Sequence, residues 1–313
     1  MEEINKILEK FTKKPYLVKM GAKKIAKRYH YTEENVREAR RIWHNKYGFL
    51  IDTPTLAKKK EPKILILDIE TAPMKAFIWK RWKENISLEQ TISEWFMICW
   101  SAKWLGSNTV YSDCLTPEEI LNEDDKRITK TISEFLDECD VAVAYNGCAF
   151  DFPKIQTRMI VNGIKPISAY KVIDPKIIAK KQFGFSSNKL DSLARMFGFD
   201  TKLETSFELW RDCMNGKQEA LDYMVKYNQY DVELLEKVYL KIVPYAKGLP
   251  NLNVFRSYDT LKCPICGCEH LEQIDDYHTN TNTYNQYKCI KCGAISRSRK
   301  TNKINRNDFL IPL

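Results

Sequence analysis

The central part of the chain begins with nine residues that read Lys63-Ile64-Leu65-Ile66-Leu67-Asp68-Ile69-Glu70-Thr71. A short run of isoleucine and leucine between two prolines predicts a buried β-strand rather than a helix. Residues two apart in a strand point to the same face, so the carboxylates of Asp68 and Glu70 should project together. Paired like charges in an apolar setting are costly unless a cation neutralises them, which favours a divalent-metal site. The alternative is a strand that ends at Leu67, followed by two solvated loop acids.

The composition is that of an ordinary soluble globular protein. Of the 313 residues, 44% are hydrophobic and 29% are charged, which suits one sizeable core with small appendages. No apolar run approaches the roughly 20 residues that cross a bilayer, and the acidic start lacks the apolar segment of a secretory signal. We therefore expect no membrane partner and a cytoplasmic location, either the nucleoid or, for a phage-encoded protein, the host cytoplasm.

Positive charge is concentrated at the two ends of the chain. Residues 1–60 carry 16 Lys and Arg against 7 Asp and Glu, residues 61–259 carry 26 against 29, and residues 260–313 carry 8 against 5. Basic arms on either side of a slightly acidic centre suit a polyanion that the arms bind and the centre processes. The alternative is that the lysine-rich ends only keep the protein soluble.

Residues 1–52 show three helical patterns. Thr32 is a good N-cap for the third helix, because the two glutamates after it complement the positive end of the helix. The second and third helices, joined by a turn at His30-Tyr31, resemble a helix-turn-helix, although such turns often carry glycine where His30 stands. A three-helix cap with a solvated basic face is the alternative. The third helix would bury Val36, Ala39 and Trp43 and would expose Arg37, Arg40 and Arg41.

The region from residue 63 to residue 248 alternates strand and helix patterns, and residues 53–62 before it have the composition of a linker. Segments rich in Ile, Trp, Val and Tyr predict two strands that form an antiparallel meander with the opening strand, turning at Gly106-Ser107-Asn108. The meander strands are expected at 97–105 and 109–112, further strands at 141–145 and 171–174, and helices at 116–139, 152–161 and 218–240, with helical stretches up to about residue 212.

Two further predicted elements carry an acid. A second apolar strand runs directly into Asn146-Gly147-Cys148-Ala149-Phe150-Asp151. The last long helix places Tyr227 and Asp231 four residues apart and therefore on one face. A single acid of this kind is more often a cap or a surface residue. Three of them at the ends or inner faces of core elements favour a common site.

These acids resemble the motifs of the DEDD family of 3′–5′ exonucleases. Asp68-Ile69-Glu70-Thr71 is similar to the first motif, and Asn146-x-x-x-Phe150-Asp151 is similar to the second motif of the proofreading domains of family B DNA polymerases. Tyr227-x-x-x-Asp231 is similar to the third motif in its tyrosine form, DEDDy, because the histidine form would need histidine at Lys226. The resemblance spans residues 62 to 245. It implies an RNase H-like α/β fold, a mixed sheet flanked by helices, in a domain of residues 63–248.

The resemblance also implies a two-metal-ion site for Mg²⁺ or Mn²⁺. Asp68 would bridge both ions, and Glu70 and Asp231 would hold the ion that carries the attacking water. Asp151 would support the second ion, directly or through water, and Tyr227 would orient or help to deprotonate the water. Four carboxylates without a nearby His or Cys form a hard oxygen site of the kind these ions prefer.

Other residues of these motifs are expected to contact substrate or to be structural. The resemblance implies that Asn146 and Phe150 line the pocket of the terminal nucleotide, and we assign Thr71 to substrate binding as well. Asp174 and Asp191 do not belong to the catalytic quartet. We interpret them as structural, at a strand end and on a helix surface.

The C-terminal region contains two Cys-x-x-Cys-Gly knuckles, separated by 22 residues. Four thiolates on two tight turns bind zinc tetrahedrally, and such a site is structural because no coordination position is left open. Residues 258–300 therefore resemble a zinc ribbon, with a hairpin between the knuckles and with His270 as an alternative ligand. Residues 301–313 are a basic tail. The predicted zinc ligands are Cys263, Cys266, Cys289 and Cys292, and the basic residues that could contact phosphate are Arg297, Arg299, Lys300, Lys303 and Arg306.

The leading interpretation is a free-standing, metal-dependent 3′–5′ exonuclease that acts on DNA, at single-stranded 3′ ends. The sequence leaves no stretch for a polymerase domain, so any proofreading would be done in trans with a replication or repair polymerase. One alternative is an RNA 3′–5′ exonuclease with the same site. Another is a DNA-binding regulator built around an inactive nuclease fold.

Overall fold

The computed structural model describes residues 2–13, 17, 22–47, 61–199, 203–255 and 260–302. The chain divides into two compact units, residues 1–60 and residues 61–313. Most of the predicted linker at 53–62 and most of the predicted basic tail lie outside the described residues, as do Lys303 and Arg306. No helix of the described part is long and apolar enough to cross a membrane.

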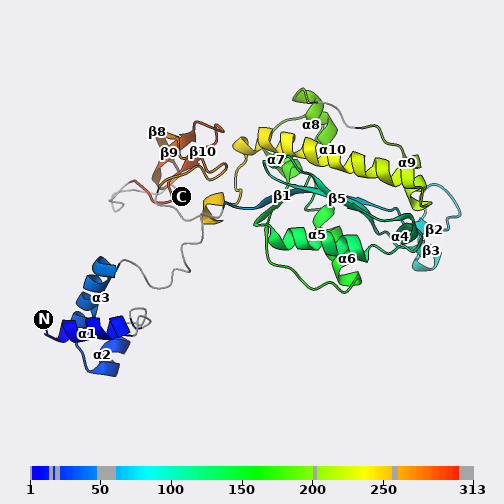
Figure 1. Cartoon of the computed structure of the whole chain (residues 1–313). Helices are drawn as coiled ribbons and strands as arrows, with labels where there is room; N and C mark the ends of the chain where they lie inside the picture. The colour runs from blue at the N-terminus through cyan, green and yellow to red at the C-terminus, as the bar shows by residue number, and fades with distance from the viewer. Residues whose placement is uncertain are drawn as a thin grey trace. The chain divides into compact units, whose positions relative to one another are not determined.

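The described residues of the first unit form three helices, α1 (Glu2–Lys13), α2 (Ala22–Tyr29) and α3 (Glu33–Tyr47) (Figure 1). Their common core includes Phe11 and Trp43, whose rings meet edge to face at 6.0 Å. Thr32 caps α3 as expected, because its hydroxyl accepts a hydrogen bond from the backbone N–H of Asn35. His30 adopts the left-handed backbone that favours glycine, with a φ of 57°. The turn between α2 and α3 is therefore tight even without a glycine.

Helix α3 buries Val36 and Ala39, and it exposes Arg37 and Arg41, as the sequence pattern predicts. The prediction for Arg40 is wrong, because this side chain is half-buried. Arg40 lies four residues after Val36 and therefore at the edge of the buried stripe. Burial lowers the pKa of its guanidinium.

The strands of the central sheet in the second unit are β1 (Ile64–Thr71), β4 (Met97–Trp104), β5 (Tyr111–Cys114), β6 (Val141–Val143) and β7 (Lys171–Ile173). Their order in the sheet is β5-β4-β1-β6-β7. β1, β4 and β5 form the expected antiparallel meander, and β6 and β7 continue the sheet in parallel beyond β1. The last meander strand begins at Tyr111, later than predicted, because Thr109 N–H donates to Ser107 Oγ in a turn after β4.

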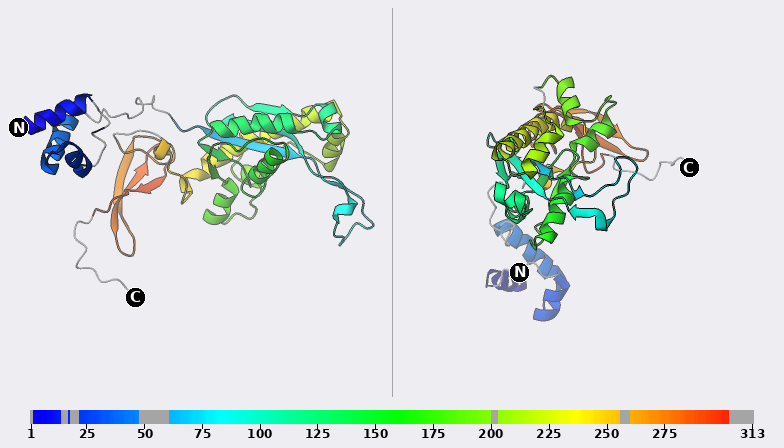
Figure 2. Two further views of the ribbon diagram at one scale, coloured as in Figure 1. Left: turned by 90° about the horizontal axis from the view of Figure 1, so that it is seen from below. Right: turned by 90° about the vertical axis from the view of Figure 1, so that its right-hand side faces the viewer.

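Helices cover both faces of this sheet, which makes it a mixed α/β fold (Figures 1 and 2). Helix α10 (Gln218–Ile242) packs on one face, against β1 and β4, and α5 (Lys126–Glu138) and α6 (Asp151–Val161) cover the other face. The shorter helices are α4 (Pro117–Leu121), α7 (Pro175–Gln182), α8 (Leu190–Met196) and α9 (Phe207–Met214), and two 3₁₀ turns, η3 (Val243–Tyr245) and η4 (Leu252–Phe255), follow α10.

Strand β1 is buried on both faces, which accounts for its continuous apolar sequence. Leu65 and Leu67 belong to the core beneath α5 and α6. Ile64 and Ile66 belong to the core beneath the second half of α10. Asp68 continues the series of Ile64 and Ile66, and Glu70 follows it, so both acids point to the α10 side of the sheet.

The single helix predicted at 116–139 is wrong, because the chain forms α4 and α5 with a break between them. The break holds Glu123, whose φ is 54°, and Asp125, whose carboxylate is fully buried. Asp125 accepts hydrogen bonds from Met97 N–H at 2.8 Å and from the Arg158 guanidinium. A continuous helix would carry Asp125 away from these partners.

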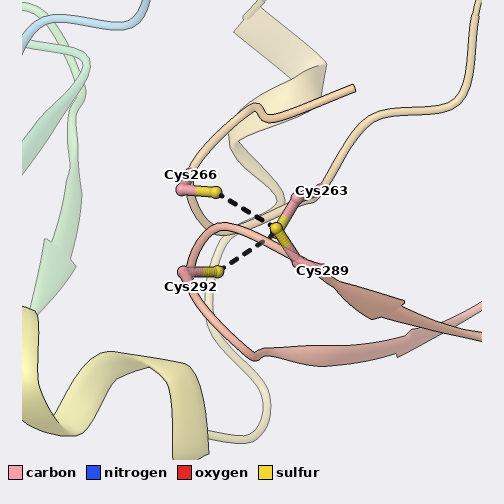
Figure 3. Close-up of side chains that lie close together, drawn as sticks. All are labelled: Cys263, Cys266, Cys289 and Cys292. Atoms are coloured by element: carbon pink, nitrogen blue, oxygen red, sulfur yellow. Dashed lines mark hydrogen bonds between the residues drawn. The ribbon is translucent and has the colours of Figure 1, made fainter. Parts of the chain in front are cut away.

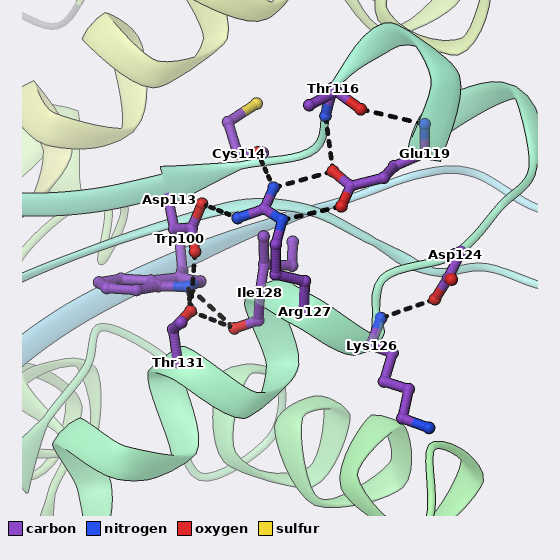
Figure 4. A network of polar contacts seen from close by, with 10 residues as sticks. All are labelled: Trp100, Asp113, Cys114, Thr116, Glu119, Asp124, Lys126, Arg127, Ile128 and Thr131. Carbon is purple, nitrogen blue, oxygen red and sulfur yellow. Dashed lines mark hydrogen bonds and ion pairs between the residues drawn. The ribbon is translucent and has the colours of Figure 1, made fainter.

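Helices α4 and α5 are nevertheless joined to each other and to β5 by one side chain, Arg127 (Figure 4). Its guanidinium donates to both carboxylate oxygens of Glu119, to Asp113 and to the carbonyl of Cys114. Thr116 and Glu119 also form the capping box that begins α4.

A hairpin arm, defined as residues 72–96, leaves the sheet between β1 and β4, and the sequence patterns did not predict it. It contains β2 (Lys75–Ala76), a 3₁₀ turn η2 (Leu88–Gln90) and β3 (Thr91–Ser93), with β2 antiparallel to β3. Figure 2 shows the arm, in cyan, projecting from the sheet.

The last part of the second unit is a small antiparallel sheet in the order β10-β9-β8, formed by β8 (Leu271–His278), β9 (Thr283–Cys289) and β10 (Ile295–Arg297). β8 and β9 form the hairpin expected between the two cysteine knuckles. Leu252 N–H donates to the carbonyl of Pro264, which ties η4 to the first knuckle.

Candidate active site

Three of the four predicted catalytic acids converge where β1 meets α10. Asp68, Glu70 and Asp231 each offer a carboxylate oxygen, and these oxygens lie within 4.8 Å of one another. The strand places Asp68 and Glu70 on one face, and α10 crosses that face with Asp231 on its buried side. The alternative of two solvated loop acids is therefore wrong, since both residues lie within β1.

The fourth acid, Asp151, lies next to this cluster but not in it. Its side chain is almost fully buried at the start of α6, and its Oδ1 accepts a hydrogen bond from the backbone N–H of Ile69 at 3.2 Å. Ile69 is the residue between Asp68 and Glu70. Burial raises the pKa of Asp151 to about 7, and backbone N–H hydrogen bonds oppose part of this increase.

Tyr227 lies one helical turn before Asp231 on the buried side of α10. Its ring meets that of Trp210 in α9 edge to face, with the centroids 6.3 Å apart. Only 4% of Tyr227 is exposed. The contact with Trp210 and the burial fix the position of the ring beside the acid cluster.

Asn228 is a site residue that the sequence analysis missed. Its Nδ2 donates a hydrogen bond to Asp68 Oδ2 at 2.7 Å, and the side chain has no exposed surface. The spacing in the sequence could have identified it, because Asn228 lies three residues before Asp231 and therefore on the same face of the helix. Asparagine is also a poor residue for a helix interior unless its side chain has a specific partner.

A cavity of about 550 Å³ lies at the end of β1, where Thr71 follows Glu70, and none of the three clustered acids is among the described residues that line it. Thr71 lines it, together with Lys154 and the aromatic rings of Trp95, Phe207 and Trp210. Lys154 Nζ donates to Thr71 Oγ1 at 3.3 Å and lies 3.7 Å from the centroid of the Trp95 ring. Burial lowers the pKa of Lys154. Thr71 was predicted from the sequence as a substrate-binding residue, and Lys154 was not.

The other two predicted substrate-binding residues have different surroundings. Phe150 is 37% exposed, and Lys154 Nζ lies 4.9 Å from its ring centroid, at the edge of the same region. The Asn146 side chain instead accepts a hydrogen bond from Lys176 Nζ at 3.3 Å, and Asn146 is not among the described residues that line the cavity.

Asn146 and its neighbours form a strained turn that leads β6 into α6. The φ of Asn146 is 66°, in the left-handed region, and its backbone N–H donates to Asp174 at 3.0 Å. A Cβ on Gly147 would lie 2.5 Å from Ala144 Cβ, so the position has no room for a side chain. Asp174 also accepts hydrogen bonds from Cys148 N–H and Lys176 N–H, which agrees with its interpretation as structural.

The four predicted zinc ligands converge in the C-terminal sheet (Figure 3). Their sulfur atoms lie within 4.8 Å of one another, with Cys263 and Cys292 at 3.7 Å and Cys266 and Cys289 at 3.6 Å. Four sulfurs at about 2.3 Å from one ion would be separated by about 3.8 Å. The same distances are far too long for a disulfide. Among the described residues, the cluster consists of these four cysteines and does not include His270.

Both knuckles close in the same way. The N–H of the glycine after each knuckle donates to the carbonyl of the first cysteine, Gly267 to Cys263 and Gly293 to Cys289, each at 2.9 Å. The glycines have φ values of 74° and 75°, which a residue with a side chain rarely adopts. The Cys-x-x-Cys-Gly pattern thus follows from the turn geometry.

A match to a family model supports the fold. Residues 106–243 match a family model described as the RNase_H superfamily. No curated protein matches the chain. Among solved structures, the family B DNA polymerase from the hyperthermophilic archaeon Pyrobaculum calidifontis matches with 16% sequence identity and a TM-score of 0.43, over 64% of this chain and 28% of the polymerase chain. The superfamily match and the mixed five-stranded sheet together define an RNase H-like fold and, at the level of the superfamily, support a nuclease.

Proposed function

We propose that this protein is a metal-dependent 3′–5′ exonuclease that acts on single-stranded 3′ ends of DNA. The observation that carries this proposal is the cluster of Asp68, Glu70 and Asp231 within 4.8 Å. Three carboxylates at this separation repel one another unless cations neutralise them. Their oxygen atoms are the ligands that Mg²⁺ and Mn²⁺ prefer, so the residues present fit these ions.

In this proposal, different residues of the protein hold two such ions and orient the attacking water. When bound, the ions supply a more acidic water and neutralise charge on the leaving 3′ oxygen. Asp68 would hold both, Glu70 and Asp231 would hold one, and Asp151 would support the other through water, in keeping with its place beside the cluster. The Tyr227 hydroxyl would orient the attacking water and help to remove its proton.

The cavity at the end of β1 would receive the terminal nucleotide. Its volume of about 550 Å³ is in the range of small-molecule sites, and its aromatic lining offers faces on which a base can stack. Lys154 would attract the phosphate, and Thr71 would hold Lys154 in place through their 3.3 Å hydrogen bond. Phe150 would contact the nucleotide at the edge of this region.

The direct test uses the full-length protein with 20-nucleotide single-stranded DNA and RNA, each labelled at the 5′ or the 3′ end, in Mg²⁺, Mn²⁺ or EDTA. We expect a ladder of shortened 5′-labelled DNA and early release of the 3′-labelled nucleotide, only with metal ions. Asp68→Asn and Asp231→Asn should abolish cleavage and leave the circular dichroism spectrum unchanged. Asp191→Asn, which changes a surface carboxylate paired with Arg195, is the matched control.

The same assay separates the alternatives. Faster degradation of RNA than of DNA would assign the site to RNA. Absence of cleavage of every substrate would contradict the exonuclease and favour a DNA-binding regulator with an inactive nuclease fold. Near-normal turnover by Asp68→Asn would show that the acid cluster is not the catalytic site.

We also propose that Cys263, Cys266, Cys289 and Cys292 bind one structural Zn²⁺. Their sulfur separations fit a tetrahedral site, and four protein ligands leave no position for substrate. Elemental analysis of the purified protein should find about one zinc per chain, and Cys289→Ser should lose it. A zinc-free wild-type protein with the same thermal unfolding would contradict the assignment.

A further inference from the structure

The hairpin arm exposes an unusual amount of apolar surface. Soluble proteins rarely leave contiguous large apolar side chains in water unless they bind something. Trp79 is 94% exposed and Trp82 is 82% exposed. The large side chains of the arm that are at least half exposed include Phe77, Ile78, Trp79, Trp82, Ile86 and Leu88.

Polar side chains within the arm hold its tip in this conformation. The Glu84 carboxylate accepts hydrogen bonds from the backbone N–H groups of Trp79 and Lys80 and from Gln90 Nε2, at 2.8 to 3.1 Å. These backbone hydrogen bonds lower the pKa of Glu84, so the carboxylate stays ionised. Gln90 also donates to the carbonyl of Phe77. The two tryptophans are thus displayed by a defined loop.

The tip is also basic. The five residues Trp79-Lys80-Arg81-Trp82-Lys83 contain three cations between and beside the two indoles. Within the described residues, none of these three cations forms an ion pair, whereas Lys75 at the base of the arm pairs with Glu123 at 2.8 Å. The positive charge at the tip therefore remains available to a polyanion.

The base of the arm lines the cavity at the end of β1. Thr71, Ala72 and Met74 line the cavity where the chain leaves the sheet, and Trp95 lines it where the chain returns. Ala72 N–H donates to the carbonyl of Phe96 at 2.8 Å and closes the base. Trp79 is five residues from Met74, so it lies within about 18 Å of it.

We propose that the arm binds the unpaired strand upstream of the 3′ end, with bases stacked on Trp79 and Trp82 and phosphates paired with Lys80, Arg81 and Lys83. This proposal rests on the exonuclease proposed above and adds the determinant of single-strand recognition. Indole faces beside cations are the combination that binds single-stranded nucleic acid without sequence preference. An apolar protein partner would not require three cations among the aromatic rings.

The test is binding of 5′-fluorescein-labelled dT20 to the full-length protein in EDTA, measured by fluorescence anisotropy. EDTA prevents metal-dependent cleavage, so this binding is read independently of whether the protein is an exonuclease. The double variant Trp79→Ala, Trp82→Ala should bind dT20 at least about tenfold more weakly. Trp79→Phe keeps an aromatic face and should lose less. Leu88→Ala, which removes an apolar side chain that is 87% exposed but not aromatic, should bind within about twofold of wild type.

The basic residues give a second readout. Changing Lys80, Arg81 and Lys83 to Gln should reduce the slope of log affinity against log salt by about 2, for three phosphate contacts on a single strand. A blunt 20-base-pair duplex has no unpaired bases, so its binding should depend less on the tryptophans.

Three results would overturn the proposal. The first is wild-type binding of dT20 by the double tryptophan variant. The second is an equal loss of duplex and single-strand binding, which would exclude base stacking. The third is a change of oligomeric state by light scattering in that variant at unchanged dT20 affinity, which would assign the arm to self-association.

Discussion

Asn228 links the candidate catalytic strand to the long helix by a part-buried hydrogen bond, from Nδ2 to Asp68 Oδ2 at 2.7 Å. A carboxylate that holds metal ions must keep one orientation, and its hydrogen-bonded neighbours fix that orientation. We therefore expect Asn228→Ala to lower metal affinity or turnover by about 10- to 100-fold. The measurement is the rate of dT20 degradation as a function of Mn²⁺ concentration.

The matched control is Gln229→Ala, a change at the residue that follows Asn228 in α10. Gln229 Nε2 donates to Ser112 Oγ on β5 at 3.0 Å and therefore supports packing rather than the acids. It should change the Mn²⁺ dependence little. If Asn228→Ala also leaves both the rate and the Mn²⁺ dependence unchanged, Asn228 has no part in orienting Asp68.

At the level of residues, local periodicity was enough to align the acids within each element, and the resemblance to the exonuclease motifs, not a period, joined Asp231 to the two strand acids. Strand alternation predicts that Asp68 and Glu70 share a face, and helical spacing predicts that Asp231 is aligned with Tyr227. Tertiary contacts decide the rest. The hydrogen bond from Ile69 N–H to Asp151 and the turn of Asn146 toward Lys176 depend on how the strands pack, which no local pattern encodes.

At the level of elements, the break between α4 and α5 shows how a buried charge overrides helix propensity. Asp125 has no exposed side-chain surface, and its partners come from β4 and α6. Helical periodicity on both sides of the break predicts a single helix. The pattern contains no sign that a carboxylate between the two halves serves as the anchor of β4.

We expect Arg158→Met to destabilise the protein by about 3 to 5 kcal/mol, because it leaves the buried Asp125 charge without its main partner. Arg158 is itself largely buried and donates to both oxygens of Asp125, at 2.6 and 2.8 Å. Urea unfolding followed by circular dichroism measures the change. The double variant Arg158→Met, Asp125→Asn should recover part of the loss, and a loss below about 1 kcal/mol in the single variant would contradict this account.

Unlike the buried pair of Arg158 and Asp125, the more exposed pair of Arg127 and Glu119 should make a small contribution to stability that depends on pH. The hydrogen bonds of Arg127 lower the pKa of Glu119 from 4.5 to about 2 in the folded protein. A lowered folded pKa contributes stability above pH 4.5, and that contribution is lost as the pH falls toward 2. Arg127 is 44% exposed, so the stability difference between wild type and Arg127→Met should be at most about 1 kcal/mol at pH 7. Thermal unfolding at pH 7, 4.5 and 3 should show this difference shrinking, and a constant difference would exclude Glu119 as its source.

The hairpin arm was also not predicted from the sequence, and the reason differs from that for the break between α4 and α5. Its strands contain only two and three residues, too few for a period to show. Its tip is held by the Glu84 carboxylate, which accepts from backbone N–H groups, and by Gln90, which donates to a backbone carbonyl. Such contacts follow from loop geometry and not from hydrophobic patterning. The aromatic and basic composition of the tip was visible in the sequence, but its exposure required the structure.

At the level of the whole molecule, the two compact units differ in net charge. Residues 1–60 carry a formal charge of +9, whereas residues 61–313 carry 34 basic and 34 acidic residues and are neutral. The second unit holds the acid cluster, the cavity and the arm. The first unit exposes Arg37 and Arg41 on α3, although Arg37 also pairs with Glu33 at 3.3 Å and Arg41 with Glu38 at 2.6 Å. We therefore propose that long-range attraction of nucleic acid comes mainly from the first unit, and that single-strand recognition and chemistry belong to the second.

Deleting residues 1–60 should thus weaken binding to a 30-base-pair duplex by at least about tenfold at low salt and flatten its salt dependence. Degradation of saturating dT20 should continue, since the deletion removes no residue of the acid cluster or the arm. The measurement pairs anisotropy titrations at several salt concentrations with the exonuclease assay. The full-length variant Arg37→Gln, Arg41→Gln removes two charges but keeps the first unit. If α3 contacts phosphate, this variant should reduce the slope of log affinity against log salt by the contribution of about two phosphate contacts. Equal salt slopes for wild type, deletion and variant would show that the basic unit only adds solubility.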